Sequence, residues 1–166
     1  MERTEDRARE EALKYLGARD RTEAEVRRHL KGKDCSEEEI REALDYLREF
    51  RYVDDRRYCR AFAEWSAGKG RGPQRVRREL EEKGADPELI REALEEAYGE
   101  EQESLLALEA ARAALGADGP ATEKDLARAG RRLAARGFSA AVIYRTLGRL
   151  RREQGEGFEE GEEPQE

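Results

Sequence analysis

Apolar residues recur along the chain at helical spacing, in a pattern that appears three times. Each copy holds two pairs of apolar residues; the members of a pair are four positions apart and ten positions separate the pairs. The copies are Val26, Leu30, Ile40 and Leu44, then Val76, Leu80, Ile90 and Leu94, then Ala129, Leu133, Ile143 and Leu147. Residues four apart share one face of a helix, so each copy predicts two helices with one buried face. Recurrence at a nearly fixed period indicates tandem copies of one structural unit.

Capping residues and prolines extend each copy to three helices. Thr22 with Glu25 is a capping-box pattern, in which the two side chains satisfy backbone N–H groups at a helix start. A first helix is predicted over 9–17, before this cap. The predicted starts of the later helices are Ser36, the pair Asp54–Asp55, Pro73, Pro87, a point near Glu101, Thr122 and Ser139. Proline suits a first helical position because its φ is already helical.

These patterns predict an all-α fold of three tandem three-helix repeats, stacked into an elongated curved array. The repeats are expected at 1–52, 53–100 and 101–153. Residues 154–166 contain glutamates but no lysine or arginine, and few apolar residues, so we expect an acidic disordered tail. Charged residues make up 44% of the chain, which leaves a thin core that suits stacked repeats.

Two local features carry further expectations. Tyr58, Phe62 and Trp65 form an aromatic stripe at helical spacing, and such stripes usually pack in the core. Asp34 stands where the other repeats have Gly84 and Gly137. We therefore expect the second helix of the first repeat to stop earlier than its counterparts, near Gly32.

Opposite charges are segregated along the chain. Residues 56–80 carry a net charge of +6 and residues 124–152 carry +8, whereas residues 81–109 carry −9. The two basic zones predict contact with an acidic partner or a nucleic-acid backbone. A plain solvated surface is the alternative for any one residue. The candidate binding residues are Lys69, Arg71, Arg75, Arg78, Arg128, Arg131, Arg132, Arg145, Arg149 and Arg152.

Residue patterns typical of catalysis are missing. His29 is the single histidine and has no triad pattern beside it, and Cys35 and Cys59 are too far apart for a tetrahedral metal site. The glycines at 68–72 do not match a phosphate-binding loop and predict a hinge between helices. We therefore expect no enzyme activity, metal or cofactor. No apolar run approaches the length of a membrane span, so we expect a cytoplasmic protein with reduced thiols.

The stretch 52–84 combines an acidic pair, an aromatic-rich helix, a basic glycine elbow and the run VRRELEEKG. In this order it resembles the RecX family of bacterial RecA regulators, and the likeness extends over nearly all of 9–153. The resemblance implies a mainly negative regulator that binds RecA and lies in the groove of its filament on single-stranded DNA. It implies inhibition of the ATPase, strand-exchange and coprotease activities of RecA in recombinational DNA repair and the SOS response.

Two other classes of function remain open from the residues. One is a nonspecific DNA-binding helical protein, with possible weak direct DNA binding, and the other is a helical scaffold for a different partner. Sequence-specific readout of DNA is disfavoured, because the third helices start with acidic or alanine residues and not with side chains that read base edges. We expect a monomer.

Overall fold

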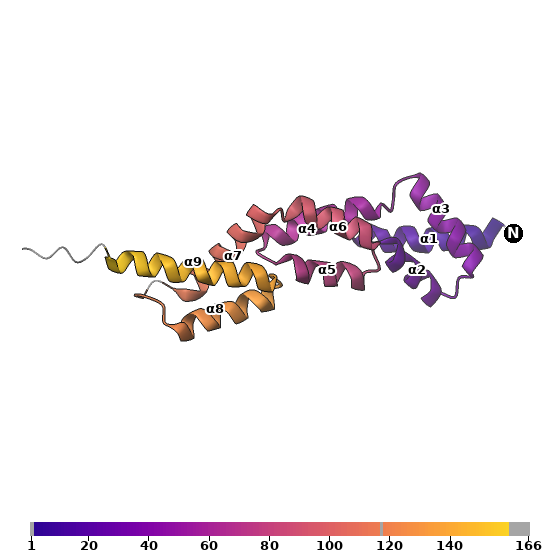
Figure 1. Cartoon of the computed structure of the whole chain (residues 1–166). Helices are drawn as coiled ribbons and strands as arrows, with labels where there is room; N and C mark the ends of the chain where they lie inside the picture. Colours follow the sequence, from indigo (N-terminus) through magenta and orange to yellow (C-terminus); the bar gives the residue numbers. More distant parts are fainter. Residues whose placement is uncertain (1, 117, 160–166) are drawn as a thin grey trace, which may run out of the picture. The chain divides into compact units, whose positions relative to one another are not determined.

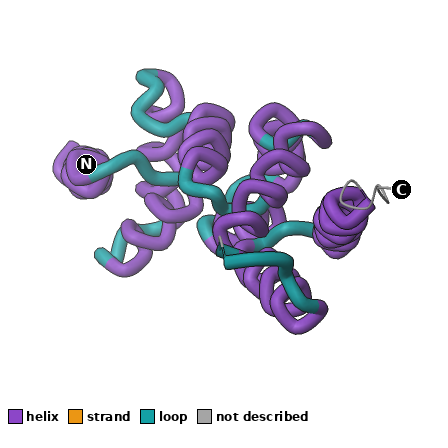
Figure 2. The backbone as a smooth tube through the Cα atoms, turned by 90° about the vertical axis from the view of Figure 1, so that its left-hand side faces the viewer, coloured by secondary structure: helices purple, strands orange, loops and turns teal. Residues whose placement is uncertain are grey.

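Helices form all of the regular secondary structure that is described in this protein. The structure is a computed structural model that describes residues 2–116 and 118–159, and no strand occurs among them (Figure 2). The helices follow one another as labelled in Figure 1. They are α1 (Glu2–Ala18), α2 (Glu23–Gly32), α3 (Glu37–Glu49), α4 (Asp55–Gly68), α5 (Pro73–Glu82), α6 (Pro87–Ala97), α7 (Glu100–Leu115), α8 (Glu123–Arg136) and α9 (Ala140–Glu159). The predicted all-α fold built from three-helix units is confirmed.

The predicted helix starts lie where their capping chemistry indicated. Thr22 accepts a hydrogen bond from the backbone N–H of Glu25 at 3.2 Å, and the Glu25 side chain accepts one from the N–H of Thr22. Ser36 and Thr122 make the same reciprocal bonds at the starts of α3 and α8. These bonds satisfy N–H groups that a first helical turn leaves without partners.

Two helices extend past their predicted limits. α1 begins at Glu2, before the predicted range of 9–17. α9 continues to Glu159, beyond the expected start of the acidic tail at Gln154, and the disorder of this tail remains a prediction. Gln154, Glu156 and Glu159 are good helix formers, and low hydrophobicity does not prevent a helix from continuing. The rest of the predicted tail, 160–166, lies outside the described residues.

The helices divide into two compact units. Unit 1 contains residues 1–63 and 77–96, and unit 2 contains residues 64–76 and 97–166. The repeat predicted over 53–100 contributes to both units, because the division falls within α4 and α5. The predicted repeat boundaries remain predictions.

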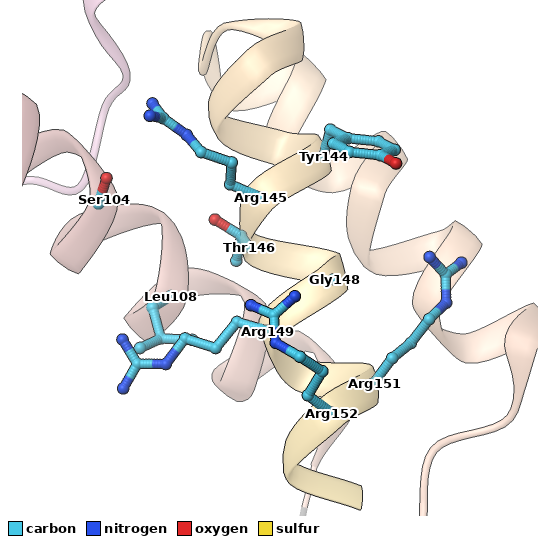
Figure 3. A pocket seen from close by; sticks show the side chains of 9 residues that line it. All are labelled: Ser104, Leu108, Tyr144, Arg145, Thr146, Gly148, Arg149, Arg151 and Arg152. Carbon is cyan, nitrogen blue, oxygen red and sulfur yellow. The ribbon is translucent and has the colours of Figure 1, made fainter. Parts of the chain in front are cut away.

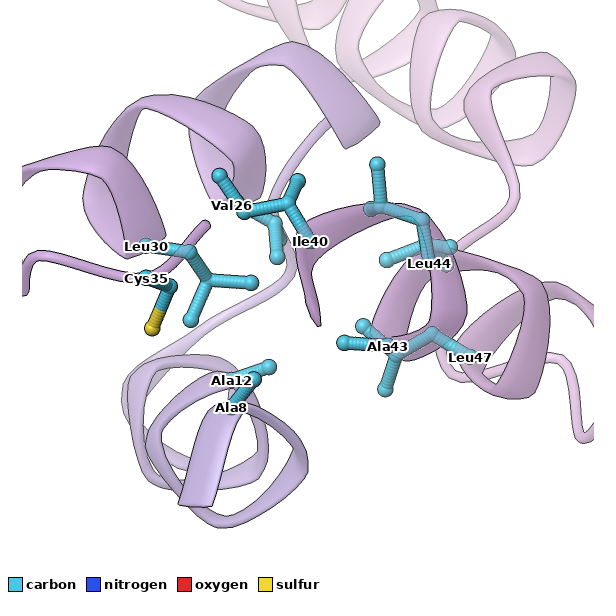
Figure 4. Packing of buried hydrophobic residues seen from close by; sticks show 10 residues of the cluster. Ala8, Ala12, Val26, Leu30, Cys35, Ile40, Ala43, Leu44 and Leu47 are labelled. Atoms are coloured by element: carbon cyan, nitrogen blue, oxygen red, sulfur yellow. The ribbon is translucent and has the colours of Figure 1, made fainter. Parts of the chain in front are cut away.

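The core of unit 1 is built mainly from α1, α2 and α3, which pack on one another (Figure 4). α1 contributes only small buried side chains, Ala8 and Ala12, so the neighbouring helices approach it closely. The predicted pairs of α2 and α3 supply the larger side chains. The larger residues that are fully buried in the core of unit 1 include Val26, Leu30, Ile40, Leu44 and Leu47.

The core of unit 2 is built mainly from α7, α8 and α9. Its buried residues include Ala107, Leu108, Ala111, Leu126, Leu133, Phe138, Val142 and Leu150. Gly130 of α8 allows α9 to approach, because a Cβ there would lie 3.1 Å from the Leu147 side chain. The predicted pairs of α2 and α3 are therefore buried, whereas in α9 the predicted pair Ile143 and Leu147 is only partly buried and Val142 and Leu150 enter the core instead.

The aromatic stripe of α4 is not uniformly buried. Tyr58 and Phe62 are partly buried and stack with ring centroids 6.1 Å apart. Trp65 is 51% exposed, and the guanidinium of Arg71 lies 4.7 Å from the centre of its ring. The prediction that Trp65 is a core residue is wrong. A cation over its ring stabilises the exposed indole, because the ring face is electron-rich.

A buried hydroxyl in unit 1 joins the start of α2 to the end of α5. The Oγ of Thr22 donates a hydrogen bond to the carbonyl of Lys83 at 2.6 Å. At the next residue, Gly84, a Cβ would lie 2.4 Å from the Cβ of Ala24. Gly84 also has a φ of 75°, which favours glycine. The two helix ends therefore meet without room for a side chain at this glycine.

Unit 2 contains the equivalent junction, between the start of α5 and the end of α8. The N–H of Gly72 donates to the carbonyl of Arg136 at 2.8 Å, and the N–H of Gln74 donates to that of Gly137 at 2.9 Å. A Cβ on Gly72 would lie 2.4 Å from the backbone of Gly137. Here backbone N–H groups supply the donors that Thr22 supplies in unit 1.

The end of α2 has the same backbone conformation as the ends of α5 and α8, but an aspartate takes the place of the glycine. Asp34 adopts a φ of 60°, as Gly84 and Gly137 adopt left-handed values, and it is exposed. The carbonyl of Lys33 accepts a hydrogen bond from Nη2 of Arg7 in α1 at 2.7 Å. α2 ends at Gly32, the expected residue, but it is in register with the end of α5 at Glu82 and so stops no earlier than α5. Aspartate tolerates the left-handed conformation that the chain needs there.

Replacement of Thr22 by valine tests the junction in unit 1. Thr22→Val removes a helix cap, which costs about 1 kcal/mol, and leaves the Lys83 carbonyl without its donor, which costs about 1–3 kcal/mol more. Thr122→Val is the matched control, because among the described residues the Thr122 hydroxyl bonds only to Asp125 of its own cap, so a capping loss of about 1 kcal/mol is expected. Urea denaturation followed by circular dichroism measures both. Equal losses of unfolding free energy in the two variants would contradict the junction.

Gly72→Ala tests the junction in unit 2. The new methyl group would collide with the backbone of Gly137 and Phe138, so we expect a loss of about 1–3 kcal/mol in unfolding free energy. Gly68→Ala is the control from the same segment, because a Cβ on Gly68 meets nothing within 4 Å. That variant should be neutral or gain up to about 1 kcal/mol, since alanine is the better helix former. A Gly72→Ala protein that unfolds like the wild type would show that the close approach is absent.

Candidate functional site

The arginines of α9 surround a hollow in unit 2. Val142, Thr146 and Leu150 are buried at four-residue spacing, and this turns the intervening arginines outward. The hollow has a volume of about 420 Å³ and lies over α9 and the adjoining part of α7 (Figure 3). Its lining residues are Ser104, Leu108, Tyr144, Arg145, Thr146, Gly148, Arg149, Arg151 and Arg152. We call it the α9 pocket.

The pocket arginines fall into paired and unpaired groups. Arg149 donates from Nε to Glu153 at 3.1 Å, and Arg112 of α7 donates to both oxygens of the same carboxylate at 3.1 Å. These two guanidinium groups, Arg112 first, lower the pKa of Glu153. By contrast, Arg145 and Arg152 form no ion pair with any side chain that the structure describes.

Arg151 has a structural partner on α8. It donates two hydrogen bonds to the carboxylate of Glu123, at 2.9 and 3.0 Å. This contact lowers the pKa of Glu123. Arg151 therefore joins α9 to the start of α8, although its stem lines the pocket.

The predicted C-terminal arginines do not form one cluster. Arg145, Arg149 and Arg152 line the pocket, but Arg128, Arg131 and Arg132 of α8 are exposed and do not line it. Arg128 also pairs with Asp125 at 3.3 Å. The last repeat therefore presents two separate arginine surfaces, the α9 pocket and the outer face of α8.

The basic residues of the elbow differ in their surroundings. Arg71 covers Trp65, and its carbonyl accepts a hydrogen bond from the Tyr98 hydroxyl at 2.6 Å. Lys69 lines a second hollow in unit 2, of about 270 Å³, together with Arg136 of α8. Arg75 lies at the unit 2 junction, where its Cβ faces Gly137. Arg78 lies on α5 within unit 1.

Sequence reasoning did not identify Arg112, Arg136 and Arg151 as parts of these surfaces. Arg112 meets Glu153 across 41 positions, and Arg151 meets Glu123 across 28. Ion pairs at such separations leave no periodic signal in the chain. Only the packing of α7, α8 and α9 brings them together.

His29 and Cys59, residue types that often take part in catalysis, lie in packed surroundings. Among the described residues, no cluster of three or more His, Cys, Asp or Glu is placed to hold a metal ion. His29 stacks on Tyr15 with ring centroids 4.1 Å apart, and its Nε2 lies 3.8 Å from a Glu11 oxygen. Cys59 is fully buried, and burial raises the pKa of its thiol to about 11. Within the described part of the chain, none of the helices is long and apolar enough to cross a membrane.

These features define an all-α protein of three-helix units that presents arginine-rich surfaces. Comparison with protein families then identifies the units. Residues 8–47 match the first three-helix domain of RecX, and residues 54–94 match the second. The chain belongs to the RecX family. RecX proteins are regulatory proteins, and membership supports a general role as a regulator with RecA as the partner.

Solved structures extend the likeness beyond these two domains. The crystal structure of RecX from Lactobacillus salivarius shares the fold, with a TM-score of 0.82 and 21% identity over 90% of this chain and 98% of that one. A crystal structure of regulatory protein RecX has a TM-score of 0.75 and 26% identity, covering 86% of this chain and 72% of that one. A comparison with curated proteins found no match.

Burial of Cys59 predicts that it resists alkylation. With a pKa of about 11, only about one thiol in a thousand is ionised at pH 8, and the thiolate is the reactive form. Mass spectrometry after iodoacetamide treatment should show Cys59 unmodified in the folded protein and modified in concentrated urea. Glutathione in the same tube serves as the reagent control. Rapid labelling of Cys59 in the folded protein would contradict its buried position.

Proposed function

We propose that this protein is a mainly negative regulator of RecA that binds RecA and lies in the groove of its filament on single-stranded DNA. It acts by inhibiting the ATPase, strand-exchange and coprotease activities of RecA, in recombinational repair and the SOS response. Two matching RecX domains, at residues 8–47 and 54–94, carry the proposal. We further propose that it acts as a cytoplasmic monomer, without enzyme activity of its own.

The arginine surfaces support this proposal. A RecA filament on DNA offers both protein carboxylates and phosphates, and guanidinium groups bind either in a bidentate way. Arg145 and Arg152 are exposed and unpaired among the described side chains, so binding them breaks no ion pair that the structure describes. Arg131 and Arg132 have the same property on α8. Each of these four side chains can bind a partner without breaking an ion pair that the structure describes.

A titration of RecA ATPase tests the function. RecA is assembled on single-stranded DNA, and hydrolysis of ATP is followed while this protein is added. We expect hydrolysis to fall as the protein concentration rises. Unchanged hydrolysis, with no retention of the protein on RecA in pull-downs with and without DNA, would remove the proposal. Retention on DNA without RecA would indicate a nonspecific DNA-binding protein. For such a protein, the logarithm of the affinity for DNA should fall linearly with the logarithm of the salt concentration, with a slope of about 0.7–0.9 for each phosphate neutralised.

Charge reversal of the unpaired pocket arginines tests the surface. In the double variant Arg145→Glu and Arg152→Glu, we expect half-inhibition of the ATPase to need at least about tenfold more protein, a loss of about 1.4 kcal/mol. Neither arginine has an ion pair among the described side chains, so the helix content measured by circular dichroism should not change.

The double variant Arg145→Lys and Arg152→Lys is the matched control, since it keeps both charges. It should inhibit more strongly than the glutamate variant. Equal inhibition by the wild type and the glutamate variant would exclude the α9 pocket from the mechanism.

A further inference from the structure

A glycine in the middle of α9 forms the floor of the α9 pocket. Gly148 lies between the buried residues Thr146 and Leu150, well inside a helix of 20 residues. Glycine in a helix interior is less stable than alanine by about 0.5–1 kcal/mol. Such a residue calls for a physical reason.

Packing within unit 2 does not supply that reason. At Gly130 of α8, a Cβ would lie 3.1 Å from Leu147, so close approach of α9 explains the glycine. At Gly148, the nearest atom to a Cβ would be Nη1 of Arg152 at 3.7 Å, an ordinary contact with a flexible side chain. An alanine would therefore fit. What Gly148 provides is the hollow itself, bordered by the guanidinium groups and the ring of Tyr144 (Figure 3).

The border of the pocket is both apolar and charged. Tyr144 is 79% exposed and lines the pocket, and Leu105 of α7 is 58% exposed. Leu105 lies in an adjoining hollow that shares Arg145 and Arg149 with the pocket. Exposed aromatic and aliphatic side chains beside arginines are typical of the centre of a protein–protein interface.

Two carboxylates argue against a nucleic-acid backbone at this place. Glu100 and Glu101 line the hollow that contains Leu105. A phosphate backbone is negative throughout its length, so it would be repelled at this rim. A protein segment, in contrast, can place an acidic residue near Arg145 and an apolar residue near Leu105.

A carboxylate of this chain already occupies part of the same surface. Glu153 accepts hydrogen bonds from both Arg112 and Arg149, each at 3.1 Å. Arg145 lies four positions before Arg149, on the next turn of α9 towards the helix start, and has no such partner among the described residues. Arg145 therefore repeats one of the two guanidinium groups that bind Glu153, one turn away, without a carboxylate partner among the described residues.

We propose that the α9 pocket docks a protein segment that carries an acidic and an apolar side chain. The acidic side chain pairs with Arg145 or Arg152, and the apolar one contacts Leu105 or Tyr144 over the floor at Gly148. This inference rests on the proposed function, in which RecA supplies the segment. It assigns the pocket to protein contact and leaves the outer face of α8 as the surface for phosphates.

A larger side chain at Gly148 distinguishes a role of this residue in partner binding from a role in stabilising the fold. Glutamine is uncharged and a good helix former, so Gly148→Gln blocks the hollow while favouring the helix. Gly155→Gln is the matched control, because it makes the same change in the same helix where a Cβ meets nothing within 4 Å. Binding to RecA without DNA and binding to a fluorescent oligothymidine are measured separately, together with the melting temperature.

We expect Gly148→Gln to weaken binding to RecA by at least about tenfold and to change binding to the oligonucleotide by less than about twofold, because an interface centre tolerates intrusion poorly. Its melting temperature should equal or exceed that of the wild type. Gly155→Gln should bind both partners as the wild type does.

Three outcomes would overturn the inference. If Gly148→Gln bound RecA as tightly as the wild type does, the docking role of the pocket would be excluded, while the proposed function would stand. If Gly148→Gln weakened binding to the oligonucleotide alone, or weakened binding to RecA and to the oligonucleotide equally, the pocket would be assigned to nucleic acid. Failure of the wild-type protein to bind RecA, with or without DNA, would remove the proposed function and this inference together.

Discussion

The ends of the second helices of the repeats impose the constraint on which the rest of this structure depends. A helix leaves its last carbonyl groups without partners, and burial of such a group without a donor is costly. α2, α5 and α8 end alike in this respect, at the carbonyls of Lys33, Lys83 and Arg136. Arg7 satisfies the first, Thr22 the second and the N–H of Gly72 the third. A repeat is therefore completed by groups that lie outside its second helix.

This constraint explains why one position carries different residues in the three repeats. Gly84 and Gly137 lie against the start of another helix, at distances that exclude a Cβ. Asp34 adopts the same left-handed conformation on an exposed surface, and the nearby carbonyl is met by a long arginine side chain instead. All three residues share the left-handed conformation. Only the two glycines pack closely against the start of another helix.

Pairing divides the many arginines by role. Arg48, Arg112 and Arg151 bind carboxylates of other helices and so connect elements of the fold. Arg71 covers an exposed indole. Arg145 and Arg152 differ, since no described side chain neutralises them and they border a hollow with an apolar edge. Many arginines therefore stabilise the fold, and Arg145 and Arg152 are the two for which we propose partner binding.

Sequence by itself determined the features that depend on near neighbours. Caps at Thr22, Ser36 and Thr122 and the apolar pairs of each repeat follow from contacts within one or two turns, so the all-α fold was predictable. Tertiary structure alone decided the second bond of Thr22, the exposure of Trp65 and the separation of the α8 arginines from those of the pocket. Each of these depends on which distant segment lies alongside, and residue spacing contains no record of that.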